Sequence, residues 1–179
     1  MTRTAALVCV GAIAALATGA AAQEKPNFAG RWSSDAASTP AGRGGRGAGV
    51  GDAGSGWGPV ISITQVASQL TIEYAFFTRG DMQPPLRFVY ALDGTETKNS
   101  VMMGRGVQVE TSKASWDGDT LVITTLFPFT NPSTGQPMTS EVKRTLSLAS
   151  PASLVVETVR VGVPGGPSST TRTVYTKSS

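Results

Sequence analysis

Beyond residue 58 the chain alternates short runs of β-branched and aromatic residues with turn-forming residues. Gly, Pro, Asp and Asn separate the runs, which is the pattern typical of strands joined by tight turns. The segments that fit are 60–66, 69–77, 86–91, 98–103, 107–116, 119–127, 138–148, 153–162 and 170–177. Together with residues 28–33 they predict about ten strands and no helix.

Most of the connections between these segments are short. The turn candidates are "VASQ" at 66–69, "LDGTET" at 92–97, "WDGD" at 116–119 and "ASPAS" at 149–153. Short turns make successive strands pair antiparallel as neighbours. The sequence therefore predicts an all-β fold, an antiparallel up-and-down meander barrel of about eight to ten strands, because closure removes the exposed sheet edges. A two-sheet sandwich is the competing architecture.

Period-two alternation indicates which side chains face the interior. In 69–77 the residues that share one side and are expected to point inward are Leu70, Ile72, Tyr74 and Phe76. In contrast, 121–127 is apolar on both sides, with Leu126 opposite to Phe127. We therefore expect a cover, either a loop or a partner, over the outer face of that strand.

The first residues resemble a secretory signal. Arg3 precedes an apolar stretch, and Ala20 to Ala22 supply the small residues of a cleavage site, so residues 1–22 are expected to be removed on export to the periplasm or beyond. The only cysteine, Cys9, lies within this segment, and the remaining chain has no disulfide. Residues 23–34 should then hold the first strand and residues 59–179 the rest of a single domain.

Between these parts, residues 35–58 are expected to form a flexible, disordered glycine-rich loop. The stretch 41–58 has too few apolar side chains to offset its backbone entropy. Arg43 and Arg46 lie in an RGG-like context, but a solvated linker is favoured over RNA binding. The whole chain carries 15 Lys and Arg against 12 Asp and Glu, too balanced for a nucleic-acid surface.

The segment "NFAGRW" at 27–32 is a candidate structural motif. Phe28, Gly30 and Trp32 share one side of an extended strand, and Gly30 is expected to leave room for a large ring. Trp32 can then plug one end of the barrel, although a surface aromatic is the alternative. Trp116, beside a predicted turn, is a further structural candidate.

Several motifs resemble known families. An aromatic-x-Gly-x-Trp on the first strand of a meander barrel is similar to the start of lipocalins and fatty-acid-binding proteins, the calycin group. "SWDGDTLVITT" (115–125), "VKRTLSL" (142–148), "LVVETVRVG" (154–162) and "TTRTVYTK" (170–177) follow the order of the last strands of a fatty-acid-binding protein. "NFAGRWSSDAAS", "LDGTE", "WDGDTLVITT" and the terminal "VYTK" also resemble a group of uncharacterised secreted proteins from bacteria such as acidobacteria.

The resemblance to fatty-acid-binding proteins implies a ligand carboxylate held by two arginines and a tyrosine. One matching position is Arg144, which shares a face with apolar neighbours on its strand. Its partner could be a ligand carboxylate or a nearby Asp or Glu, or the residue could face outward. The final strand departs from the Arg-x-Tyr motif: two residues separate Arg172 from Tyr175, so Tyr175 is expected inside and Arg172 in water. Residues 35–58 replace the family's helical lid.

Other chemistry is weakly supported. The chain has no histidine, the commonest general base and metal ligand, so we expect no enzyme, no metal and no cofactor. Asp117 and Asp119 are the closest carboxylate pair, but their glycine-containing run favours a type I′ hairpin turn over acid–base catalysis. No segment after the signal is long and apolar enough to span a bilayer.

The leading hypothesis is a secreted barrel that binds a small apolar or amphipathic molecule, with an anionic head group as one option. The candidate ligand-binding residues are Tyr74, Phe76, Phe127, Arg144 and Tyr175. The alternative is a non-enzymatic envelope or interaction module whose barrel is filled by its own side chains. The sequence leaves the ligand's identity and the oligomeric state open.

Overall fold

The computed structural model describes residues 24–34, 55–74, 85–103, 106–131, 134–161 and 168–178. Within these ranges the chain forms ten strands and no helix. The strands are β1 (Gly30–Ser33), β2 (Val60–Val66), β3 (Gln69–Tyr74), β4 (Leu86–Ala91), β5 (Glu96–Met103), β6 (Gly106–Asp117), β7 (Thr120–Thr130), β8 (Pro137–Ser150), β9 (Ser153–Val161) and β10 (Ser169–Ser178). Every predicted strand is present, and its bounds differ by at most three residues from those predicted.

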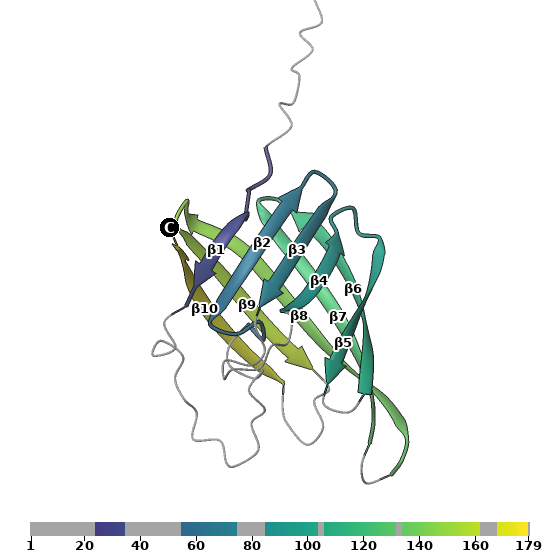
Figure 1. Ribbon diagram of the computed structural model, residues 1–179. Coiled ribbons are helices and arrows are strands. Elements are labelled where there is room, and N and C mark those ends of the chain that lie inside the picture. The colour runs from purple at the N-terminus through teal and green to yellow at the C-terminus, as the bar shows by residue number, and fades with distance from the viewer. Residues whose placement is uncertain are drawn as a thin grey trace, which may run out of the picture.

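All ten strands belong to one antiparallel sheet in the order β4-β3-β2-β1-β10-β9-β8-β7-β6-β5. The first strand pairs with the last, with Trp32 opposite Lys177, and also pairs with β2. The sheet therefore curls round into a nearly closed up-and-down barrel (Figure 1). This confirms the predicted barrel, an architecture compatible with a calycin-like fold, and the two-sheet sandwich is wrong.

The seam of the barrel lies between β4 and β5, which are consecutive in the chain but occupy the two ends of the strand order. There the side chain of Asn99 takes the place of a backbone ladder. Its Oδ1 accepts from the Val89 N–H at 2.8 Å, and its Nδ2 donates to the Val89 carbonyl at 3.1 Å. A primary amide offers the same donor and acceptor as a peptide group, so this buried side chain satisfies the backbone N–H and carbonyl of Val89 on the facing edge of β4.

Aromatic side chains pack together at the end of the barrel where β1 begins. Phe28 and Trp32 are fully buried, and the indole Nε1 of Trp32 donates to the Phe28 carbonyl at 2.9 Å. The ring of Phe28 stacks on Trp116, with centroids 5.8 Å apart. Lys25 donates to the carbonyl of Gly118 in the β6–β7 turn at 2.9 Å. Phe28, Trp32 and Trp116 thus pack together where the chain enters β1.

Gly30 serves a different purpose from the one predicted. A Cβ placed on it would lie 2.6 Å from Cε of Lys177, and its φ is 144°. The space beside Gly30 is thus filled by the aliphatic part of Lys177, whose Nζ lies 5.2 Å from the centroid of the Trp32 ring. The glycine makes room for a lysine that covers the tryptophan, rather than for a ring.

Apolar side chains fill the lumen behind this aromatic end. The fully buried members include Leu70, Ile72, Leu121, Ile123, Leu146 and Leu154. Leu70 and Ile72 confirm the predicted facing of β3, whereas Phe76 lies outside the described residues. Leu126, on the outer face of β7, is 40% exposed, and the cover expected over it stays a prediction because residues 35–54 of the glycine-rich loop lie outside the described residues.

The sequence made predictions about a membrane-spanning segment, an export signal and a glycine-rich loop, and the structure describes only part of these. The described chain contains no helix that is both long and apolar enough to cross a bilayer. Residues 1–22, the expected signal, lie outside the described residues, as do 35–54 of the expected glycine-rich loop. The last four residues of that loop, 55–58, are described, and both Ser55 and Trp57 are buried in the barrel.

Candidate functional site

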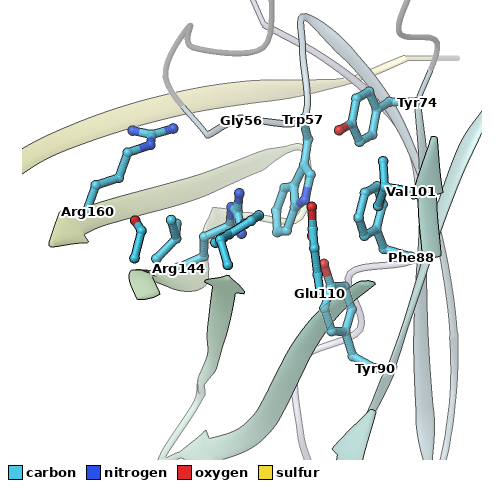
Figure 2. Close-up of a pocket in the computed structure, with 12 residues that line it drawn as sticks. Gly56, Trp57, Tyr74, Phe88, Tyr90, Val101, Glu110, Arg144 and Arg160 are labelled. Atoms are coloured by element: carbon cyan, nitrogen blue, oxygen red, sulfur yellow. The ribbon is translucent and has the colours of Figure 1, made fainter. Parts of the chain in front are cut away.

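The interior of the barrel changes from apolar to polar along β8. Its inward positions run from Leu148 and Leu146 at the filled end, through Arg144, to Val142 and Ser140. Beyond the apolar filling lies a cavity of about 220 Å³ (Figure 2). Five aromatic rings, two arginines and one glutamate stand out in its wall, which consists of Gly56, Trp57, Tyr74, Phe88, Tyr90, Val101, Glu110, Phe127, Ser140, Val142, Arg144 and Arg160.

Arg144 is the central cation of this cavity. The side chain is only 6% exposed, as the alternation on β8 predicts, and its Nε donates to the carbonyl of Ser55 at 2.7 Å. Its guanidinium carbon lies 4.9 Å from the centroid of the Trp57 ring, a geometry in which the π face stabilises the positive charge. Figure 2 shows the guanidinium beside that ring. One backbone carbonyl and one indole thus partly offset the cost of burying this arginine.

Residues 55–58 enter the lumen and form a short plug, which we call the Trp57 plug. The hydroxyl of Tyr175 donates to the Gly58 carbonyl at 2.7 Å and lies 2.5 Å from Oγ of Ser55. Because a phenol has one proton, Ser55 must donate to Tyr175 while its Oγ accepts from the Trp57 N–H at 3.2 Å. Tyr175 therefore points inward, as predicted, but its hydroxyl holds the plug instead of lining the cavity.

At Gly56 the backbone of the plug comes close to two arginine side chains. Its φ is +80°, and a Cβ there would lie 2.9 Å from Nη2 of Arg144 and 3.3 Å from Nη2 of Arg160. Two guanidinium groups, from β8 and β9, therefore approach the same backbone position. Only glycine combines this conformation with such an approach at low cost.

Glu110, on β6, supplies the carboxyl of the cavity. It is 7% exposed, and burial raises its pKa from 4.5 to about 7, with the charge of Arg144 acting in the opposite direction. Desolvation outweighs attraction here because the ionised carboxylate has no hydrogen-bond donor among the described residues. The carboxyl is therefore about half protonated at neutral pH.

The phenols around the cavity remain neutral. Burial raises the pKa of Tyr74 to about 12, with Arg144 acting to lower it, and it raises the pKa of Tyr175 to about 12 as well. Burial also raises the pKa of Tyr90, which shares a side-chain hydrogen bond with Trp57. Tyr74 and Tyr90, which line the cavity, therefore offer hydroxyl groups and apolar ring faces, but no charge, to a ligand.

Two buried threonine hydroxyls, one of them beside Arg144, lack partners within the described chain. Oγ1 of Thr158 and Oγ1 of Thr173 are buried without a hydrogen bond there, and Thr158 is the register partner of Arg144 on β9. Buried hydroxyls in native proteins are normally satisfied by protein or by ordered water. The interior beside Arg144 is therefore more polar than its packing alone requires.

The candidate ligand-binding residues divide into three groups. Tyr74, Phe127 and Arg144 all line the cavity, Tyr175 holds the plug beside it, and Phe76 lies outside the described residues. Arg172 faces water, as predicted, where its Nε lies 3.9 Å from Oε1 of Glu157.

The predicted turn at 117–119 also forms, with both aspartates exposed. Of its two central residues, Gly118 has φ +57° whereas Asp119 has no positive φ, which fits type II′ and not the type I′ turn we expected. The two carboxylates thus belong to a solvent-exposed turn and do not line the cavity.

Sequence reasoning missed Glu110, Trp57 and Arg160. The alternation on β6 was present in the sequence, but it is inverted: Val107 and Val109 are 65% and 45% exposed while Glu110 is buried. Hydrophobicity alone assigns the wrong face there. Trp57 had one usable signal, since it is a large aromatic in an otherwise small and polar segment.

No family model matches the chain, and no curated protein matches it either. Within the described residues no group of three or more His, Cys, Asp or Glu side chains is placed to hold a metal ion. The chemistry of the cavity is therefore inferred from its own residues: a cationic patch, a titratable carboxyl and aromatic walls.

Proposed function

We propose that the protein binds a small amphipathic carboxylic acid inside its barrel. The observation that carries this proposal is the burial of Arg144 in the wall of an aromatic cavity, beside a second arginine, Arg160. Nε of Arg144 is committed to the Ser55 carbonyl, while the guanidinium group borders the open space. Guanidinium groups favour carboxylates because planar, charge-assisted hydrogen bonds form between them.

The size of the cavity favours a compact ligand. Its volume of about 220 Å³ lies below the range of about 300–1,000 Å³ of ordinary small-molecule sites. It corresponds to roughly seven molecules of liquid water at about 30 Å³ each. A single-ring acid fits this space better than a long acyl chain. The proposed ligand is therefore smaller than the fatty acid that the sequence resemblance implies.

Further expectations belong to this proposal. We infer that the chain is calycin-like, that residues 1–22 direct its export, and that binding rather than catalysis is its role. The alternation of the strands and the Phe28–Trp32 end support the first of these. The filled apolar half of the barrel supports the competing candidate, an envelope or interaction module with no internal ligand.

The proposal is tested by thermal shift and calorimetry on the purified protein with benzoate, benzamide and laurate. We expect benzoate to raise the melting temperature and to give a saturable heat, whereas uncharged benzamide and long-chain laurate do neither. Arg144→Gln should lose benzoate binding. Arg172→Gln, which alters an exposed arginine on the outer face, is the matched control and should bind as the parent protein does.

Two results would decide against the proposal. Absence of benzoate binding favours the side-chain-filled barrel. Equal binding of benzoate and benzamide removes the role of the guanidinium groups. Because Arg144→Gln also loses the bond to Ser55, its melting temperature without ligand is measured alongside, and Arg160→Gln serves as a second variant that keeps that bond.

A further inference from the structure

Glu110 and Arg144 line the same cavity from different strands. Glu110 projects from β6 and Arg144 from β8, with β7 between them in the sheet, and both side chains lie at the pocket (Figure 2). Arg144 is the cation whose charge acts on the Glu110 carboxyl. That same guanidinium is the group on which the proposed ligand carboxylate depends. The Arg144 guanidinium therefore acts both on the Glu110 carboxyl and on the carboxylate of the proposed ligand.

The surroundings of Glu110 provide no other neutralising group close to it in the described chain. The groups that face it across the lumen are Tyr74 from β3, Tyr90 from β4, Arg144 from β8 and Trp57 from the plug, with Arg160 of β9 on the same cavity wall. Its register partner on β5, Asn99, has its amide committed to Val89. Of its neighbours on β7, Phe127 lines the cavity with an uncharged ring.

In the free protein the charge of Arg144 acts on Glu110 without a direct ion pair between them. We propose that the carboxylate of a bound monocarboxylic acid pairs directly with Arg144, and that binding to the protein with Glu110 ionised therefore takes up one proton at Glu110. This inference rests on the proposed function. The proton comes from solvent and adds to a carboxylate oxygen of Glu110, while the ligand stays ionised, so the cavity gains no net charge. Two ionised carboxylates in one poorly hydrated cavity would repel each other.

The ligand class follows from this exchange. A monocarboxylate restores one negative charge beside Arg144 when Glu110 is neutral, whereas a dicarboxylate would leave a second charge among the rings. Aromatic acids suit the remaining wall, because the faces of Trp57, Phe88 and Phe127 are apolar. The site is thus designed to bind an acid under mildly acidic conditions and to release it as the pH rises.

The expected pH dependence is steep. With a pKa of about 7 for Glu110 in the free protein, affinity should be nearly constant below that pH and fall about tenfold per pH unit above it. Benzoate is ionised throughout this range. Its dissociation constant should therefore rise about a hundredfold between pH 6 and pH 9.

Calorimetric titration of the protein with benzoate at pH 6, 7, 8 and 9 tests the inference. At pH 8, two buffers of different ionisation enthalpy report proton uptake directly, and we expect about one proton per benzoate. Glu110→Gln should bind with nearly the same affinity at every pH and without proton uptake. Glu141→Gln removes an exposed glutamate on the outer face of β8 and should keep the parent's pH dependence.

The possible outcomes separate the two proposals. If benzoate binds with the same affinity at pH 6 and pH 9, or without proton uptake at pH 8, the exchange at Glu110 is wrong while the proposed function stands. If benzoate binds at no pH, both proposals are wrong. The buffer comparison uses the unmodified protein, so the result does not depend on whether Glu110→Gln folds.

Discussion

The guanidinium group of Arg144 lies against the indole of Trp57, with its central carbon 4.9 Å from the ring centroid. The two residues are far apart in the sequence, and the plug that carries Trp57 also supplies the Ser55 carbonyl to Arg144 at 2.7 Å. The cation and its plug are therefore one structural unit. Changes on either side should alter both stability and the cavity.

Trp57→Ala should destabilise the protein by about 3–5 kcal/mol, the usual cost of truncating a buried tryptophan. Trp57 is 1% exposed, although it lies within residues 35–58, which the sequence predicts to be a flexible loop. Urea denaturation of the two proteins measures the difference. A change within about 0.5 kcal/mol, as for an ordinary surface site, would contradict the burial of the plug.

Gly56→Ala should be more destabilising than Gly94→Ala, and the comparison isolates the crowding of the arginines. The two glycines have similar φ values, +80° and +84°, but a Cβ at Gly94 meets nothing within 4 Å. Both variants bear a conformational cost of about 1–2 kcal/mol, whereas only Gly56→Ala pushes against Arg144 and Arg160. Thermal unfolding of both variants gives the difference, and equal losses would refute the close approach.

At pH 8, the Glu110→Gln variant should be more stable than the unmodified protein. Since the pKa of Glu110 is raised from 4.5 to about 7 by burial, the native state keeps a proton that the unfolded chain has already released. The stability that goes with neutral Glu110 is fully present below pH 4.5 and is lost as the pH rises through 7. The total loss is roughly 3 kcal/mol.

The check is the free energy of unfolding of both proteins in urea at pH 5, 7 and 9. The difference between Glu110→Gln and the parent should grow in favour of the variant as the pH rises. Glu141→Gln should run parallel to the parent over the same range. A constant difference between Glu110→Gln and the parent would show that Glu110 ionises as freely as in the unfolded chain.

Asn99→Ala should loosen the seam between β4 and β5. It removes both hydrogen bonds to Val89, and leaving these backbone groups unpaired costs about 1–3 kcal/mol each if they stay buried. Hydrogen exchange at the Val89 amide should accelerate. Asn99→Asp keeps the acceptor for the N–H but loses the donor to the carbonyl, so the amide should stay better protected than in Asn99→Ala. Ser100→Ala, at an exposed neighbour, should leave exchange unchanged.

The fold could be predicted from the sequence because local signals agree with each other. The strand predicted at 138–148 is β8, and its alternation correctly placed Arg144 inside. The same rule failed on β6, where Val107 and Val109 face out and Glu110 faces in. Alternation of apolar and polar residues identifies the inner face of a strand only where that face is apolar. In the polar half of this lumen a polar residue faces inward and apolar residues face outward, so the same pattern assigns the wrong face.

The remainder of the site depends on contacts between distant segments. No local pattern around Trp57 indicates that residues 55–58 contact Arg144 and Tyr175. These two partners lie 89 and 120 residues from Ser55, to which they are hydrogen-bonded. Likewise, Lys177 filling the space beside Gly30 depends on the pairing of β1 with β10. Local pattern predicts elements, whereas the partner of a buried polar group is decided by closure of the barrel.

The pairing of Arg31–Ser33 with residues 176–178 also sets the order of assembly. β1 gains its second neighbour only after β10 (Ser169–Ser178) has been made, so contacts of very long sequence separation complete the barrel. Such topologies fold slowly, on a scale of milliseconds to seconds. Until the C-terminal strand docks, β1 presents an open edge, and a nascent or truncated chain is exposed at this point to pairing with another molecule.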